Sequence, residues 1–147
     1  MTEEKIFRFE EACKKAGLRQ TPQRLAIFEA LAARSDHPSA NTVYNSVREK
    51  MPRISFDTVN RTLVKFVEIG AAYTVGGSGG AKRYDANFRP HQHFKCIKCK
   101  RIVDFQHEPF NNIEVPSELS GKFTILKSTV YIEGLCDICK NRDNSQV

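Results

Sequence analysis

The sequence SFDTVNRTLVKFVEIG, residues 55–70, and the stretch AAYTVGGSGGAKRYD that follows it, residues 71–85, decide the expected fold of the first half of the chain. Apolar side chains recur every three or four positions from Phe56 to Val67, which predicts a helix with one buried face. Gly70 is a natural end for this helix. Two short strand-like runs then flank the glycines of residues 76–80, which predicts a β-hairpin.

The opposite face of this helix is short, polar and cationic, and it leads to a nucleic-acid hypothesis. Three earlier helices are expected: over residues 3–16, from Thr21-Pro22 onward, and after the cap residue Ser39. This order of elements is that of a winged helix, whose polar-faced helix enters the major groove while the hairpin contacts the DNA backbone. The alternative is a plain helical domain whose polar stripe is only solvated. The predicted DNA contacts are Ser55, Thr58, Asn60, Arg61, Thr62 and Lys65 on the helix, and Lys82 and Arg83 on the hairpin.

Composition and charge narrow the class of protein. The 147 residues are 40% hydrophobic and 27% charged, which is ordinary for a soluble protein. No apolar run approaches the roughly 20 residues that a membrane-spanning helix needs, and the acidic start is unlike a secretion signal. We therefore expect a cytoplasmic protein with no membrane partner, whose five cysteines stay reduced. The net charge of +6 lies mostly in residues 1–84, which favours a polyanionic partner such as nucleic acid.

Two Cys-x-x-Cys pairs stand out in the second half. Each pair presents two thiolates from one tight turn, and two such turns close a tetrahedral Zn²⁺ site. Strands predicted at residues 101–105 and 123–132 would fold the intervening segment back. A redox-active pair or two unrelated pairs are the alternatives, but a redox motif needs only one pair. The predicted zinc ligands are Cys96, Cys99, Cys136 and Cys139. The fifth cysteine, Cys13, is predicted to be a small buried hydrophobe.

The histidines indicate a second metal site. Two of them alternate in HQHF, so in an extended segment both side chains point the same way and can hold one ion. Nitrogen and oxygen donors without a thiolate suit Fe²⁺, Mn²⁺ or Zn²⁺. The candidate ligands are His37, Asp85, His91, His93 and Asp104. His107, with no such partners nearby, is predicted to be an ordinary surface residue.

Several separated motifs occur together in one order along the chain. They are GLRQTPQRLAIFEAL at 17–31, HPSANTVYNSV at 37–47, ISFDTVNRTLVKFVEIG at 54–70, HQHFKCIKCKRIVDF at 91–105 and CDIC at 136–139. In these motifs the chain resembles the ferric uptake regulator (Fur) family of metal-responsive repressors. Three positions depart from the usual pattern: Asn60 stands where Tyr is common, and Gln92 and Lys100 also differ, although none of them is a ligand.

The resemblance implies an α+β fold in three parts. A winged-helix DNA-binding domain would span residues 1–84, a hinge residues 85–90, and a metal-binding α/β dimerisation domain residues 91–147. The four paired cysteines would hold structural zinc. The five His and Asp candidates would form the regulatory site, filled by Fe²⁺ or Mn²⁺, and the homodimer would bind double-stranded operator DNA as a repressor.

Asp104 favours one branch of the family. Peroxide-responsive (PerR) members tend to carry Asp at this position, whereas iron-sensing members usually carry Glu. For the peroxide-responsive branch the resemblance implies oxidation of a ligand histidine, His37 or His91, by peroxide at bound Fe²⁺. Iron-responsive (Fur) and zinc-responsive (Zur) repressors are the alternatives within the family.

Two further alternatives belong to other classes of function. Two histidines and a carboxylate also form the facial triad of non-haem iron oxygenases, but the chain lacks the many strands of a barrel. The other alternative is an interaction module that holds structural zinc alone. A regulator that is not an enzyme is the expected class.

Overall fold

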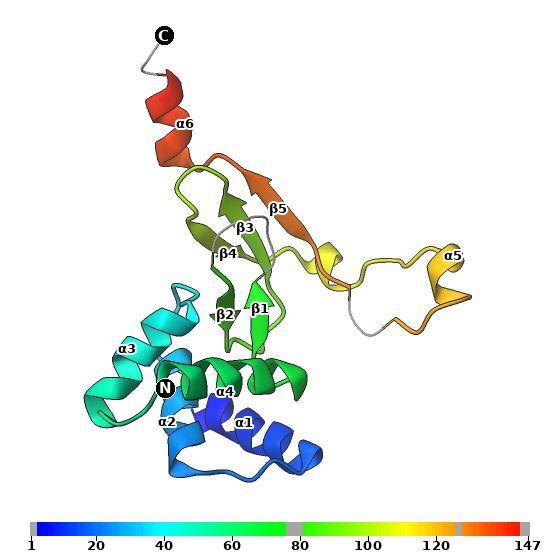
Figure 1. The fold of residues 1–147 in the computed structure, drawn as a ribbon. Helices are drawn as coiled ribbons and strands as arrows, with labels where there is room; N and C mark the ends of the chain where they lie inside the picture. Colours follow the sequence, from blue (N-terminus) through cyan, green and yellow to red (C-terminus); the bar gives the residue numbers. More distant parts are fainter. Residues whose placement is uncertain (1–2, 76–80, 126–127, 145–147) are drawn as a thin grey trace. The chain divides into compact units, whose positions relative to one another are not determined.

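The computed structural model describes residues 3–75, 81–125 and 128–144, and the chain divides into two compact units, residues 1–88 and 89–147 (Figure 1). The boundary lies inside the segment predicted as a hinge; its action as a hinge stays a prediction. No helix of the described residues is long and apolar enough to cross a membrane.

Four helices make up most of the first unit. They are α1 (Glu3–Ala16), α2 (Pro22–Ala32), α3 (Ala40–Lys50) and α4 (Phe56–Glu68). Each of the last three begins after a Thr or Ser whose side-chain oxygen accepts a hydrogen bond from a backbone N–H in the first turn. These cap residues are Thr21, Ser39 and Ser55, and they satisfy donors that a helix start otherwise leaves unpaired. The helix boundaries therefore agree with the local signals of the sequence.

Aromatic side chains join three of these helices in one core. The Phe9 and Phe28 rings stack with centroids 4.2 Å apart, and Phe66 meets Phe9 edge-on at 5.2 Å. Cys13 lies in the same cluster and is 1% exposed, which confirms it as a buried hydrophobe. Burial raises the pKa of its thiol, which keeps the sulfur protonated and unreactive.

The predicted hairpin is present. Strand β1 (Tyr73–Val75) pairs antiparallel with β2 (Arg83–Asp85), and the predicted glycine tip lies outside the described residues. Strand β1 is shorter than the predicted run because Ala71 and Ala72 are buried beneath the end of α4 rather than paired in the ladder, and β2 begins only at Arg83. The first unit is thus a winged helix.

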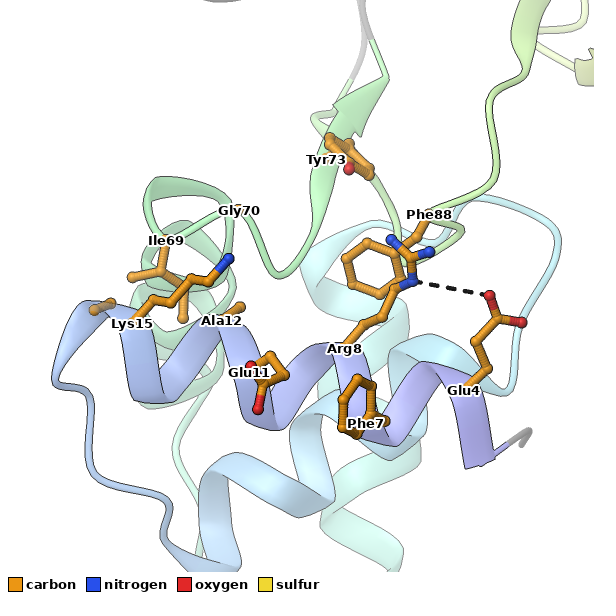
Figure 2. Close-up of a pocket in the computed structure, with 11 residues that line it drawn as sticks. Glu4, Phe7, Arg8, Glu11, Ala12, Lys15, Ile69, Gly70, Tyr73 and Phe88 are labelled. Carbon is orange, nitrogen blue, oxygen red and sulfur yellow. Dashed lines mark ion pairs between the residues drawn. The ribbon is translucent and has the colours of Figure 1, made fainter.

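An open groove of about 870 Å³ runs along α1 in this unit (Figure 2). The end of α4, Tyr73 and Phe88 form its other wall, and the Arg8 guanidinium lies 5.7 Å from the centre of the Phe88 ring. Arg8 also lies 3.8 Å from a Glu4 carboxylate oxygen. None of the residues that line the groove is a predicted metal ligand.

A three-stranded mixed sheet forms the centre of the second unit. Strand β3 (Gln92–Cys96) lies between β4 (Ile102–Phe105), which is antiparallel to it, and β5 (Tyr131–Gly134), which is parallel. The short helices η1 (Glu108–Asn111) and α5 (Ser117–Ser120) lie between β4 and β5, and α6 (Asp137–Asn144) follows β5. A helical unit followed by this mixed unit gives the predicted α+β architecture.

The strand predicted at residues 123–132 is wrong over most of its length. Residues 123–125 and 128–130 are not in a strand, and regular pairing begins only at Tyr131. Phe123 is 61% exposed and Ile125 is 39% exposed. High β-propensity alone does not make a strand, because the propensity depends on packing against a neighbouring strand.

Candidate metal centres and nucleic-acid interface

Four cysteines come together at one end of the second unit. Their sulfur atoms, one from each of Cys96, Cys99, Cys136 and Cys139, all lie within 4.8 Å of one another. The first pair follows the end of β3, where Lys100 at φ 66° turns the chain into β4. The second pair opens α6. The Ile97 N–H donates to the Gly134 carbonyl at 2.9 Å, which joins the first turn to the end of β5, two residues before Cys136.

This donor set fits structural zinc. All five cysteines of the chain are free thiols, and the 3.8 Å between the sulfurs of Cys99 and Cys136 is far beyond the ~2.05 Å of a disulfide. Backbone N–H groups of Cys136 and Cys99 lower the pKa of the Cys96 thiol to about 6, which favours the thiolate that zinc requires, whereas burial raises the pKa of the Cys139 thiol. Four thiolates around one point suit a tetrahedral ion with no open position, so the site is structural rather than catalytic.

The first unit carries one histidine–aspartate pair. His37 Nε2 lies 3.6 Å from Asp85 Oδ2, and the two residues are 3% and 8% exposed. His37 has a φ of 55°, in the left-handed region. A non-glycine residue in a sparsely populated backbone region costs on the order of 1–3 kcal/mol and persists only where its surroundings impose it.

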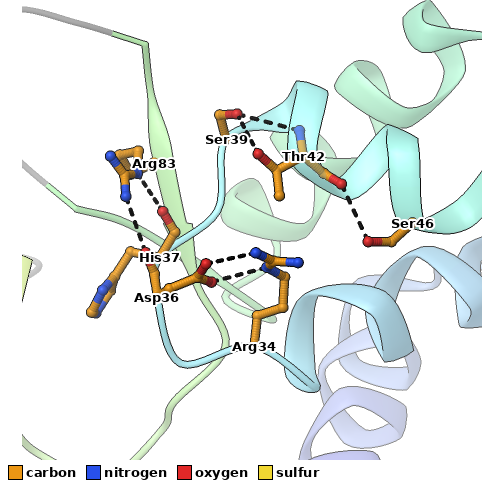
Figure 3. A network of polar contacts seen from close by, with 7 residues as sticks. All are labelled: Arg34, Asp36, His37, Ser39, Thr42, Ser46 and Arg83. Atoms are coloured by element: carbon orange, nitrogen blue, oxygen red, sulfur yellow. Dashed lines mark hydrogen bonds and ion pairs between the residues drawn. The ribbon is translucent and has the colours of Figure 1, made fainter.

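Hydrogen bonds impose that conformation on the loop around His37 (Figure 3). The Arg83 guanidinium donates from Nε to the His37 carbonyl and from Nη2 to the Asp36 carbonyl at 3.0 Å. The Arg34 guanidinium donates two hydrogen bonds to the Asp36 carboxylate, of 2.9 and 2.6 Å. The Tyr84 N–H donates to the Pro38 carbonyl at 3.0 Å, so the loop is fastened to β2 on both sides of His37.

The second unit carries another such pair. His93 on β3 lies directly opposite Asp104 on β4, with Nε2 and Oδ1 3.4 Å apart. The His91 ring stands 4.6 Å from the His93 ring. Its Nδ1 is bonded to the Arg89 carbonyl at 2.6 Å, and a proton on Nδ1 leaves the Nε2 lone pair to face a metal. The structure thus brings His91 beside His93, as the alternation in HQHF predicts, and pairs His93 with Asp104.

The donors in the two pairs suit the same kind of ion. Imidazole nitrogens and carboxylate oxygens without a thiolate favour Fe²⁺, Mn²⁺ or Zn²⁺ over Cu⁺. His37 and Asp85 belong to the first unit, whereas His91, His93 and Asp104 belong to the second. Binding of all five to one ion is proposed below.

The predicted DNA-binding face of α4 is exposed where it is charged. Arg61 has a side chain that is 80% exposed and lies 3.0 Å from Asp57, while Lys65 is half exposed and lies 3.3 Å from Glu68. Such surface pairs are weak and leave the cations available to a stronger anion. Asn60 is half-buried beside this face.

The polar uncharged residues of α4 serve its own backbone. Ser55 caps the helix and accepts from the Thr58 N–H at 3.1 Å, and the Thr62 hydroxyl donates to the Thr58 carbonyl at 2.7 Å. On the hairpin, Lys82 is exposed, whereas Arg83 is half-buried against the His37 loop. The charged residues Arg61, Lys65 and Lys82 are therefore the stronger candidates for DNA contact.

Besides Arg83, which is predicted only as a DNA contact, three residues have roles in these sites that the sequence analysis did not anticipate. Arg34 and Asp36 fix the His37 loop, and the signal was their proximity to His37 in the sequence RSDH. Gln92 is buried: its amide donates to Asn111 at 2.7 Å and its carbonyl accepts from the His107 N–H at 2.9 Å. It thereby ties η1 to the strand that carries His93. His107 itself is exposed, as predicted, with its ring 4.5 Å from that of Phe110.

Comparison with known proteins agrees with this architecture. The chain matches the sequence profile of the ferric uptake regulator family over residues 15–133. It is 34% identical over 131 residues to the peroxide-responsive repressor PerR of Staphylococcus epidermidis, a match that covers 89% of this chain and 87% of that protein.

Solved structures share the fold. The ferric uptake regulator Fur of Helicobacter pylori is 22% identical, with a TM-score of 0.73 and coverage of 94% of this chain and 93% of that one. The peroxide stress regulator of Campylobacter jejuni is 23% identical, with a TM-score of 0.63 and coverage of 95% and 100%. With winged helix, cysteine cluster and profile in agreement, the chain belongs to the ferric uptake regulator family and is a metal-responsive transcriptional regulator rather than an enzyme.

Proposed function

We propose that this chain is a peroxide-responsive repressor that acts in the cytoplasm and binds operator DNA as a homodimer when Fe²⁺ or Mn²⁺ fills its regulatory site. The observation that carries the proposal is the presence of one histidine–aspartate pair in each unit, His37 with Asp85 and His93 with Asp104. The 34% identity to a peroxide-responsive repressor and the aspartate at position 104 support the choice of signal.

In this proposal, metal binding selects one relative orientation of the two units. An ion held by both pairs, with His91 as a further ligand, would fix the angle between the units and so select one conformation from the ensemble. Without the ion, the connection at residues 85–90 would leave the DNA-binding unit free to turn away. Because linkage is reciprocal, operator DNA would tighten metal binding by the same factor as metal tightens operator binding.

Peroxide would release the repressor by removing a ligand. When bound, Fe²⁺ would activate peroxide for cleavage of its O–O bond, which Mn²⁺ does not do. One peroxide oxygen would be added to a ligand imidazole, which is oxidised by two electrons, and the other oxygen would leave as water. In this proposal His37 and His91 would both be ligands of the ion, so the imidazole of either could gain that oxygen atom. An oxidised imidazole is a poorer ligand, so its loss would reopen the connection between the units.

Two surfaces would serve operator binding and dimerisation. In a two-fold dimer, the α4 helices of both copies would enter successive major grooves, and Lys82 would contact flanking phosphates. In the second unit, Phe123, Ile132 and Leu135 are 61%, 39% and 40% exposed. Exposed apolar side chains of this size are available to a protein–protein interface, and we assign these to contact with a second copy of the chain.

The decisive experiment measures operator binding by the Fe²⁺ and Mn²⁺ forms before and after brief exposure to peroxide. The Fe²⁺ form should lose the operator, with an added oxygen on His37 or His91 by mass spectrometry. The Mn²⁺ form should keep the operator under the same treatment, which controls for general oxidative damage.

Other outcomes identify the alternatives. A Fe²⁺ form that stays on DNA through peroxide with both histidines unmodified would favour an iron-responsive repressor. Binding that depends on added Zn²⁺ alone would favour a zinc-responsive one. One zinc per chain under every condition, with no second metal, would instead favour a module with structural zinc only.

A further inference from the structure

We propose that Arg83 is a positioning residue for the metal ligand His37, in addition to any contact it makes with DNA. This inference rests on the proposed regulatory site. It assigns part of the metal affinity of that site to a side chain on β2 that is not itself a metal ligand.

The contact geometry suits arginine. The guanidinium of Arg83 donates to the carbonyls of Asp36 and His37, two consecutive groups of the same loop. Its planar fork presents several N–H donors at fixed angles, whereas a lysine ammonium is a point charge on a flexible stem. Arg83 is half-buried, and it is 46 residues from His37 along the chain, so the contact is tertiary rather than local.

The bonds act on the backbone that aims the imidazole. His37 has a φ of 55°, and its own carbonyl is one of the two that Arg83 holds. Asp85, the partner of His37, lies on the same strand two residues after Arg83. Strand β2 thus supplies both the ligand Asp85 and the side chain of Arg83, which orients the second ligand, His37.

The far side of the loop is fixed separately. Arg34 binds the Asp36 carboxylate through two bonds, and this contact together with Arg83 lowers the pKa of Asp36. The Tyr84 N–H to Pro38 carbonyl bond continues the attachment after His37. Because these contacts remain when Arg83 is changed, its removal should loosen the orientation of His37 without unfolding the unit.

The test is Mn²⁺ affinity of the full-length, zinc-loaded protein, measured by calorimetry together with the thermal unfolding midpoint without Mn²⁺. Loss of a group that orients a ligand typically costs 10–100-fold in metal affinity. We therefore expect Arg83→Ala to weaken Mn²⁺ binding by at least about tenfold, and Arg83→Lys by a smaller factor because only part of the fork is replaced. Arg19→Ala, which removes an exposed arginine elsewhere in the same unit, is the matched control and should bind Mn²⁺ like the parent.

A double-mutant cycle separates positioning from general support of the fold. If Arg83 acts through His37, Arg83→Ala should have no further effect on Mn²⁺ affinity in a His37→Ala protein. An equal loss in both backgrounds, or an unchanged affinity in Arg83→Ala alone, would overturn the inference while the regulatory site stands. Unchanged Mn²⁺ affinity in His37→Ala would instead overturn the regulatory site itself, and the positioning role with it.

Discussion

Asp104 differs from glutamate by one methylene, and its place on β4 makes that difference consequential. The carboxylate faces His93 across the ladder at 3.4 Å, so a longer side chain must bend or shift the ion. We predict that Asp104→Glu keeps operator binding by the Fe²⁺ and Mn²⁺ forms but slows peroxide-driven release, because ligand geometry controls the reactivity of a first-row metal. The measurement is the rate of operator release after peroxide.

The control for this substitution is Mn²⁺ affinity, which should stay close to that of the parent. Histidine oxidation as fast in Asp104→Glu as in the parent would show that the aspartate does not set the reactivity, and would remove the argument for the peroxide-responsive branch.

Helix α4 is organised so that folding and recognition use different side chains. Val59, Leu63 and Phe66 are fully buried, whereas Arg61 lies on the exposed side. We predict that Arg61→Ala leaves the thermal unfolding midpoint nearly unchanged, because its exposed ion pair contributes ~0–1 kcal/mol. Operator affinity should fall by ~1–3 kcal/mol, as for a lost base contact. Lys14→Ala on α1 is the control, and unchanged operator binding by Arg61→Ala would show that another helix enters the groove.

The hairpin should contribute in a different way. We predict that Lys82→Ala weakens binding to operator and unrelated DNA alike, because a phosphate contact carries no sequence information. The slope of log affinity against log salt should become shallower by about one, since one fewer counterion is released. A loss confined to the operator sequence would contradict this role. The same salt titration on Arg83→Ala tests its predicted phosphate contact.

The second unit has a small buried core in which cysteines predominate. Its buried apolar cluster, within the described residues, consists of Cys96, Cys136 and Cys139 with Phe94 packed against them. We predict that Cys136→Ser loses zinc and dimerisation together, because structural zinc contributes about 10–16 kcal/mol in small zinc domains. Zinc content and sedimentation velocity are the measurements. Cys13→Ala should keep zinc and remain dimeric; a zinc-free Cys136→Ser dimer would defeat the prediction.

Features with local causes could be predicted from the sequence. The starts of α2, α3 and α4 follow from single cap residues, and the cysteine cluster follows from spacing. The strand at residues 123–132 could not be predicted correctly, because pairing depends on distant partners. For the same reason the hydrogen bonds from Arg83 to the His37 loop could not be predicted, because no local sequence pattern indicates a contact between residues 46 positions apart.

The cysteine cluster would make the folding of newly synthesised protein depend on the supply of zinc. During synthesis the first unit emerges first and can bury its aromatic core without any ion. The buried cluster of the second unit consists mainly of cysteines, so a newly synthesised chain would need zinc before this unit could fold. Chains without zinc would stay partly unfolded and exposed to proteases, which remove unfolded protein continuously. The supply of zinc would therefore set how many molecules survive to answer any other signal.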